Sequence, residues 1–109
     1  NFLGCERPDS LSAIAPVAGG LATYSCEEGV GVWLTHGIYD TTVLPSEGET
    51  ALALWAGLNG CDETYVDIDP SPCVAYEGCA RDTHWCPHTG GHEWPYFAGE
   101  AIWDFFAAQ

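Results

Sequence analysis

The chain has 109 residues, with sixteen Asp and Glu against two arginines and a formal net charge of −14. This charge repels nucleic-acid phosphates and anionic membrane surfaces, so neither is expected as a partner. Hydrophobic residues make up 47% of the chain, which indicates a folded protein, and the length suits a single domain over residues 1–109. No apolar run is long enough to span a bilayer.

Two apolar runs come first in chain order. LSAIAPVAGG (11–20) and VGVWLTHG (30–37) each end at glycine, and both are predicted to be strands. Their apolar residues are continuous rather than alternating. This is typical of strands covered on both faces, as in a parallel sheet.

The next segment, SEGETALALWAGLNG (46–60), is predicted to be a helix that an Asn-Gly pair ends. Ser46 and Glu49 have the spacing of a capping box at its start. One face of this helix would carry Leu52, Trp55 and Ala56.

The second half begins with an acidic loop (61–73) that has room for a short strand, and a turn with a further strand follows (74–86). A closing helix (96–109) starts after Pro95. Its inward stripe would consist of Phe97, Ala101, Ile102, Phe105 and Phe106. The order predicts an α/β fold of three short, mostly parallel strands with flanking helices. So few strands would leave an apolar edge unpaired, so we expect the fold to be incomplete alone.

The cysteines are even in number, dense for the length, and contain no C-x-x-C pair. This favours disulfides formed in an oxidising compartment, and therefore secretion. The sequence does not choose their connectivity. They are Cys5, Cys26, Cys61, Cys73, Cys79 and Cys86.

Two polar side chains follow predicted strands at the same edge of the sheet. Asp40 lies just beyond the strand at 30–37, and His92 follows the strand within 74–86. The carboxyl ends of strands are where open α/β sheets build their sites. An Asp–His pair there would leave one imidazole nitrogen free as a general base. The alternative is that Asp40 is a turn residue and His92 a structural loop residue.

Four blocks occur in the order LGCERPDSLSAIAPVAGGL, HGIYDTTVLPSEG, WAGLNGC and WCPHTGGHEWPYFAGEAIWDFF. As a set they resemble the C-terminal part of secreted feruloyl esterases and poly(3-hydroxybutyrate) depolymerases, which are α/β-hydrolases. The resemblance implies that Asp40 is the acid and His92 the histidine of a catalytic triad. His36 would be structural, and no cofactor is implied.

The resemblance also implies a serine in a G-x-S-x-G elbow, and no serine of this chain has that context. The chain begins at Asn1 without Met, so we expect a processed or partial chain with the serine on an N-terminal segment or second chain. The implied function is hydrolysis of a carboxylic ester: a feruloyl or acetyl ester of plant polysaccharide, or a polyester. Whether the chain alone is an enzyme is left open.

Two kinds of metal site are alternatives for the histidines and the acidic loop. A zinc site would use His84, Cys86, His88 and His92, but no C-x-x-C half accompanies them. A calcium site would use the acidic loop, which lacks the D-x-D-x-D-G register. We therefore predict no metal.

The tryptophans divide by position. Trp33, Trp55 and Trp103 fall in strand or helix patterns and are expected in the core. Trp85 and Trp94 flank the His92 loop and are candidate substrate contacts. The alternative function is a non-enzymatic, disulfide-stapled secreted module that binds a carbohydrate or a partner chain.

Overall fold

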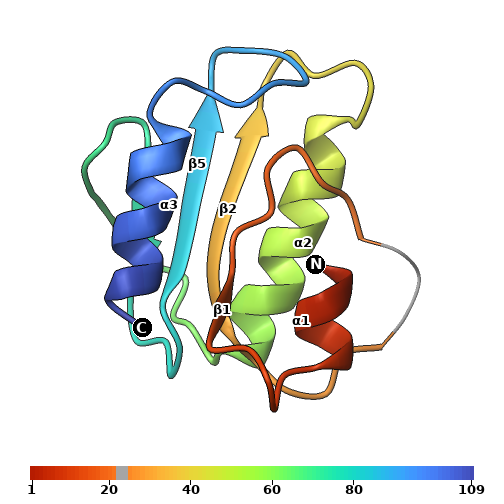
Figure 1. Ribbon diagram of the computed structural model, residues 1–109, viewed down its shortest axis with the longest axis vertical. Helices are drawn as coiled ribbons and strands as arrows, with labels where there is room; N and C mark the ends of the chain where they lie inside the picture. The colour runs from red at the N-terminus through yellow and green to blue at the C-terminus, as the bar shows by residue number, and fades with distance from the viewer. Residues whose placement is uncertain (22–24) are drawn as a thin grey trace.

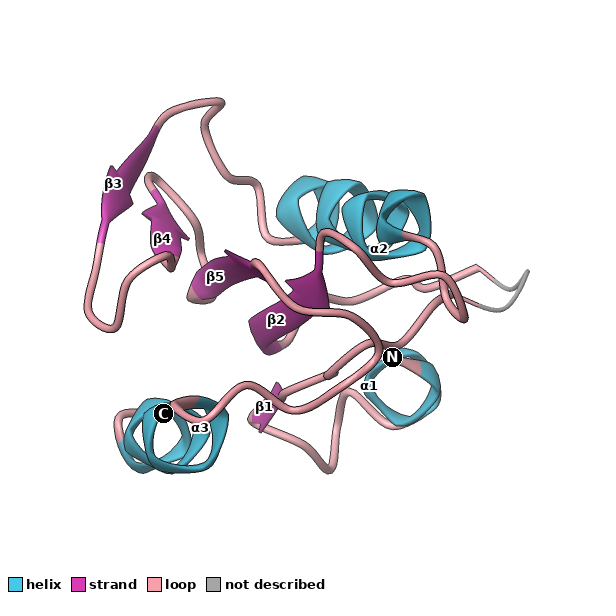
Figure 2. Ribbon diagram, turned by 90° about the horizontal axis from the view of Figure 1, so that it is seen from above, coloured by secondary structure: helices cyan, strands magenta, loops and turns pink. Residues whose placement is uncertain are grey.

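The computed structural model describes residues 1–21 and 25–109. One sheet has the strand order β1-β2-β5-β4-β3. Helices α2 and α3 lie on opposite sides of the central strands β2 and β5, and α1 lies beside β1 (Figures 1 and 2). The elements in chain order are α1 (Phe2–Glu6), β1 (Ala13–Ile14), β2 (Gly31–Gly37), α2 (Pro45–Leu58), β3 (Tyr65–Asp67), β4 (Val74–Tyr76), β5 (Thr83–His88) and α3 (Ala98–Ala107).

The α/β class is confirmed, but the prediction of three mostly parallel strands is wrong. β1 and β5 pair with β2 in parallel, whereas β4 pairs with both β5 and β3 in antiparallel fashion. The short strand that the acidic loop had room for is β3, but β4 and its pairing with β3 were not predicted. Neither strand has a buried apolar face, since every residue of β3 is exposed and every residue of β4 is only partly buried. β1 is also shorter than expected, and Pro16, which has no N–H to donate to a ladder, follows it closely.

Strand β2 is the centre of the core, and all seven of its residues are buried. Because side chains alternate along a strand, Trp33 points to the α3 side while Val32 and Leu34 point to the α2 side. Trp33 packs with Ile102 and Phe105, and Val32 and Leu34 pack with Trp55. The prediction that this strand is covered on both faces is confirmed.

Helix α2 starts earlier than the capping box predicted. Leu44 is the N-cap and Pro45 occupies the first turn, so Ser46 lies inside the helix and no side chain caps it. Proline favours the first helical position because its fixed φ suits the helix and its missing N–H would have no partner there. The capping box is therefore wrong, while the helix and its buried Trp55 are confirmed.

Helix α3 buries most of the predicted stripe, including Ala101, Ile102 and Phe105. Trp103, however, is 71% exposed and Phe106 is 41% exposed. At about 100° per residue, Trp103 falls on the side of the helix opposite the buried stripe and Phe106 at its margin. The prediction that these two side chains are buried is wrong. Among the described residues, no helix has both the length and the apolarity that a membrane crossing requires.

All six cysteines are paired within the chain, as Cys5–Cys26, Cys61–Cys79 and Cys73–Cys86. The prediction that the cysteines form disulfides is confirmed. The Cys73–Cys86 bond joins β5 to the start of β4 and is completely buried. It ties the strand that leads to His92 to the neighbouring hairpin. Three disulfides in a small domain are consistent with an oxidising compartment.

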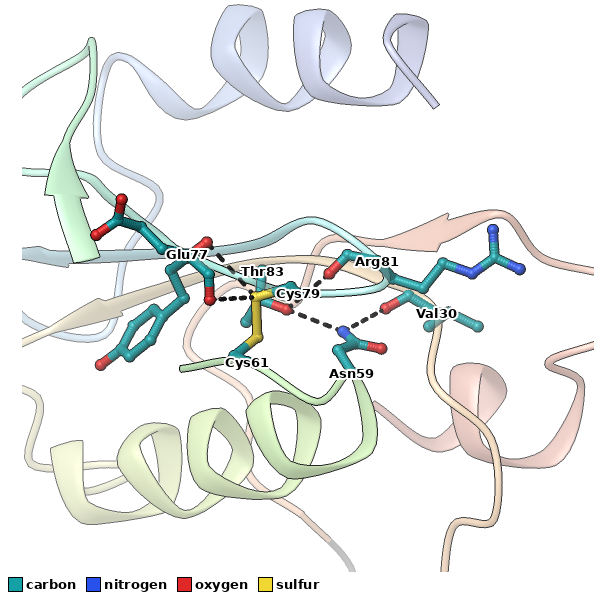
Figure 3. The surroundings of a disulfide bond; sticks show 8 residues. Val30, Asn59, Cys61, Glu77, Cys79, Arg81 and Thr83 are labelled. Carbon is teal, nitrogen blue, oxygen red and sulfur yellow. Dashed lines mark hydrogen bonds between the residues drawn. A yellow bond between two sulfur atoms is a disulfide. The ribbon is translucent and has the colours of Figure 1, made fainter. Parts of the chain in front are cut away.

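The end of α2 is anchored to the sheet by Asn59, close to the Cys61–Cys79 disulfide (Figure 3). The Asn59 Nδ2 group donates to the Val30 carbonyl oxygen and to Thr83 Oγ1, both at 2.9 Å. Asn59 is only 1% exposed, so its bonds are shielded from water. This side chain holds together the starting ends of β2 and β5.

Candidate active site

Asp40 and His92 are 52 positions apart in sequence and meet at the carboxyl ends of β2 and β5. The Asp40 Oδ2 and His92 Nδ1 atoms are 2.9 Å apart. The Asp40 side chain is fully buried, whereas that of His92 is 45% exposed. The parallel pairing of β2 with β5 brings the two loops to the same edge of the sheet.

Backbone contacts hold the two loops together. The Ile38 N–H donates to the His88 carbonyl oxygen at 2.9 Å, and the Tyr39 N–H donates to that of Gly90 at 3.1 Å. A Cβ atom on Gly37 would overlap the carbonyl oxygens of Gly90 and Gly91. Glycine at position 37 therefore allows the close approach that places His92 beside Asp40.

The Asp40 carboxylate is also held by its own turn. Oδ1 accepts from the Thr42 and Val43 N–H groups, each at 2.9 Å. Burial pushes the pKa of Asp40 upward, but the hydrogen bonds from Val43, His92 and Thr42 outweigh it, so the pKa is lowered. The arrangement keeps Asp40 ionised, as an acceptor for the imidazole.

His36, for which the resemblance implied a structural role, is a second histidine beside Asp40. Its Nε2 atom donates to the Val43 carbonyl oxygen at 2.8 Å and lies 3.4 Å from Asp40 Oδ2. The side chain is only 2% exposed. A Cβ on Gly48 of α2 would come within 2.6 Å of its Nδ1. His36 therefore packs between the Asp40 turn and α2. Local sequence patterns do not predict this contact, because it joins separate parts of the folded chain.

The tautomer of His92 follows from its partner. A carboxylate only accepts, so Nδ1 carries the proton that His92 donates to Asp40. In the neutral imidazole, Nε2 then has a free lone pair. Asp40 is the sole hydrogen-bond partner of the His92 ring among the described residues. Chemically, the pair is equipped to act as an oriented general base.

The other histidines of this region have different surroundings. His84 contacts the rings of Trp33 and Phe105, with centroids 5.3 and 5.0 Å away, and burial lowers its pKa despite the opposing charge of Asp82. His88 is 6% exposed, and burial is the main cause of its lowered pKa. Among the described residues neither ring is hydrogen-bonded to Asp40 or His92, although the charge of Asp40 acts on His88.

The two candidate substrate contacts, Trp94 and Trp85, differ in their exposure to solvent. Trp94 is 65% exposed and lies two residues beyond His92. Trp85 is partly buried against the core on the α2 side. The structure therefore gives Trp94, but not Trp85, an open surface on the His92 loop.

The alternative zinc site lacks one of its four proposed ligands. Cys86 forms a disulfide with Cys73, so its sulfur is not free to bind a metal ion. Over residues 1–21 and 25–109, no three His, Cys, Asp or Glu side chains form a group suited to a metal ion.

No protein-family model matches the chain. It is similar to two fungal proteins named "Probable feruloyl esterase C". The protein from Aspergillus oryzae is 33% identical over 121 residues, and that from Aspergillus flavus is 32% identical over 121 residues. Each match covers 97% of this chain but 44% of the relative, so the chain spans less than half of each relative's length. The similarity supports a relationship to feruloyl esterases, and hence to carboxylic ester hydrolases.

Proposed function

We propose that this chain supplies the acid and the histidine of a serine-dependent carboxylic ester hydrolase with an α/β-hydrolase fold. The observation that carries the proposal is the 2.9 Å hydrogen bond between Asp40 and His92 at the carboxyl ends of adjacent parallel strands. The similarity to two proteins named as feruloyl esterases supports the same assignment. By this proposal, residues 1–109 are part of a larger catalytic domain.

In the proposed reaction, Asp40 holds the His92 ring with its Nε2 lone pair free. Nε2 removes the proton of a serine hydroxyl while the serine oxygen attacks the ester carbonyl. His92 then gives that proton to the departing alcohol, which leaves an acyl-serine. Water, activated by the same nitrogen, hydrolyses the acyl-serine and restores the serine. No cofactor takes part.

The serine would be supplied by polypeptide outside residues 1–109. None of Ser10, Ser12, Ser25, Ser46 and Ser71 stands in a G-x-S-x-G sequence. We propose an N-terminal segment or a second chain as its source. The substrate would be a feruloyl or acetyl ester of plant polysaccharide, or a polyester, acted on outside the cell.

A fusion tests this assignment. The part of the Aspergillus oryzae relative that this chain does not match is joined to Asn1, and hydrolysis of methyl ferulate is measured. We expect turnover that His92→Ala and Asp40→Asn lower by about 10³–10⁴-fold. Trp103→Ala, an exposed change on α3, is the matched control and should leave turnover unchanged. Turnover that survives His92→Ala contradicts the proposal.

A second candidate is a secreted module that binds carbohydrate without catalysis. The exposed aromatic side chains of Trp94 and Tyr96 favour it. The fusion separates the two: a folded fusion that binds xylan and has no His92-dependent turnover supports the module.

A further inference from the structure

His36 is a buried histidine next to an exposed turn. It lies on β2, whose seven residues are all buried, and its side chain is 2% exposed. The turn that follows Asp40 is at the surface, where Thr41 and Thr42 are exposed. Hydrogen bonds within an exposed turn compete with water, so they fix the direction of a carboxylate only weakly. A buried contact from His36 would give this turn a firmer support.

Val43 connects the His36 ring to the Asp40 carboxylate. The Val43 N–H donates to Asp40 Oδ1 at 2.9 Å, and the Val43 carbonyl oxygen accepts from His36 Nε2 at 2.8 Å. One residue of the turn is therefore bonded to the carboxylate on one side and to a buried imidazole on the other. The His36 bond fixes the position of the residue from which Asp40 takes a hydrogen bond.

The distances also keep His36 from competing with His92 for Asp40. Both rings come close to the same carboxylate oxygen, Oδ2: His92 Nδ1 lies 2.9 Å from it and His36 Nε2 lies 3.4 Å from it. The longer distance exceeds the range of roughly 2.7–3.2 Å for an N–H···O hydrogen bond. The proton on His36 Nε2 is donated to Val43, which leaves Oδ2 to accept from His92.

Helix α2 lies against the other nitrogen of the His36 ring. Gly48 is a buried residue of α2, and a Cβ atom there would come within 2.6 Å of His36 Nδ1. The ring thus has α2 beside Nδ1 and Val43 beside Nε2, and it cannot shift without disturbing one of these contacts. The imidazole is a rigid support for the Asp40 turn.

We propose that His36 is a positioning residue of the site. Its hydrogen bond to Val43 holds the Asp40 turn so that Oδ2 stays directed at His92. It does not touch the substrate or transfer a proton. Without this donor the turn moves, the Asp40–His92 hydrogen bond weakens, and the proton of the His92 ring is no longer confined to Nδ1. The effect on turnover rests on the proposed function, whereas the effect on the His92 ring needs no serine.

The test is ¹⁵N NMR of the His92 ring in the 109-residue chain, since the ring nitrogen shifts report which nitrogen carries the proton. His36→Leu keeps a side chain of similar size but removes the donor, and His36→Gln restores an amide N–H in place of Nε2. His84→Leu is the matched control. His84 lies on the neighbouring strand β5 and packs against aromatic rings instead of the Asp40 turn.

We expect the His92 proton on Nδ1 in the wild type and in His84→Leu, and on both nitrogens in His36→Leu. His36→Gln should return the wild-type shifts. In the fusion that carries the serine, His36→Leu should lower kcat about 10²-fold with KM unchanged. Wild-type His92 shifts in folded His36→Leu overturn the inference, as does failure of His36→Gln to restore them.

Gly48→Ala decides the question if His36→Leu does not fold. Alanine suits a helix, and the added Cβ displaces the His36 ring while every hydrogen-bonding group stays in the chain. We expect it to spread the His92 proton over both nitrogens, and unchanged His92 shifts overturn the inference. A fusion without turnover contradicts the esterase assignment alone, because the NMR measurement does not depend on the serine.

Discussion

Gly37 and Gly91 approach so closely that no side chain fits between them: a Cβ on Gly37 would overlap the Gly91 carbonyl oxygen. Gly37 ends β2 and Gly91 precedes His92, so this contact joins the loops of the proposed acid and base. The obstacle to a larger residue is backbone, which cannot rotate away as a side chain does. Gly37 is therefore needed for the close approach of the Asp40 and His92 loops, and not only for the turn that follows β2.

The first prediction is that Gly37→Ala pushes the His92 loop away from Asp40 and destabilises the fold by about 1–3 kcal/mol, the usual cost of overpacking. Chemical denaturation measures the loss. NMR shifts of the His92 ring should report a broken Asp40 hydrogen bond.

Gly99→Ala is the control for this substitution. Gly99 lies in α3 with nothing within 4 Å of an added Cβ. Alanine there should stabilise by about 0.5–1 kcal/mol through helix propensity. Equal stability of the two variants, with an unchanged His92 spectrum, would contradict the role given to Gly37.

The second prediction concerns acid stability. The pKa of Asp40 is lowered in the folded chain, so the folded state binds this proton less tightly than the unfolded state. The resulting stability is fully present above the unfolded pKa of about 3.9 and is lost as pH falls through the lower folded value. The gap in unfolding free energy between wild type and Asp40→Asn should therefore be wide at about pH 6 and narrow toward pH 2.

Urea titrations across this pH range measure that gap. Asp67→Asn removes an equal charge from exposed strand β3 and is the control for the change in net charge. If the difference in unfolding free energy between wild type and Asp40→Asn grew as pH fell, the pKa of Asp40 would not be lowered by folding, and the explanation would be contradicted.

The third prediction is that Asn59→Ala costs about 1–3 kcal/mol. The change leaves the Val30 carbonyl and the Thr83 hydroxyl without their buried donor. Thr50→Ala removes an exposed hydrogen bond to the Ser46 carbonyl near the start of α2 and should change stability by less than about 0.5 kcal/mol. Thermal unfolding of both variants measures the difference, and similar melting temperatures would show that the Asn59 bonds are of little consequence.

The fourth prediction is that the isolated 109-residue chain hydrolyses p-nitrophenyl acetate no faster than its His92→Ala variant. An oriented base without a nucleophile has no group to form an acyl intermediate. Initial rates at equal protein concentration test this. Clear turnover that depends on His92 would mean that the pair activates water, or that a serine of this chain reaches it.

A relationship to a longer esterase would also be visible in native material. Native mass spectrometry, which preserves non-covalent complexes, would show whether a second polypeptide is bound. All six cysteines are paired within the chain, so we expect any such partner to be held without a disulfide.

Several features followed from the sequence alone because they depend on neighbouring residues. The continuous apolar run predicted that both faces of β2 are covered, and the helical spacing around Trp55 predicted α2. An even cysteine count predicted disulfides. The position of Asp40 and His92 after their strands predicted the edge of the sheet at which both would lie, because parallel strands end at the same edge.

The remaining features depend on contacts between residues far apart in the chain, which local patterns do not encode. The disulfide connectivity, the antiparallel β3–β4 hairpin beside β5, and His36 beside Asp40 all required the folded structure. So did the exposure of Trp103, which local apolarity had suggested would be buried. The sequence by itself determined near which edge of the sheet Asp40 and His92 lie. The tertiary structure decided that Asp40 and His92 touch, through the close approach of Gly37 to the Gly90–Gly91 backbone and the backbone hydrogen bonds between the two loops, because a hydrogen bond requires a precise approach of two loops.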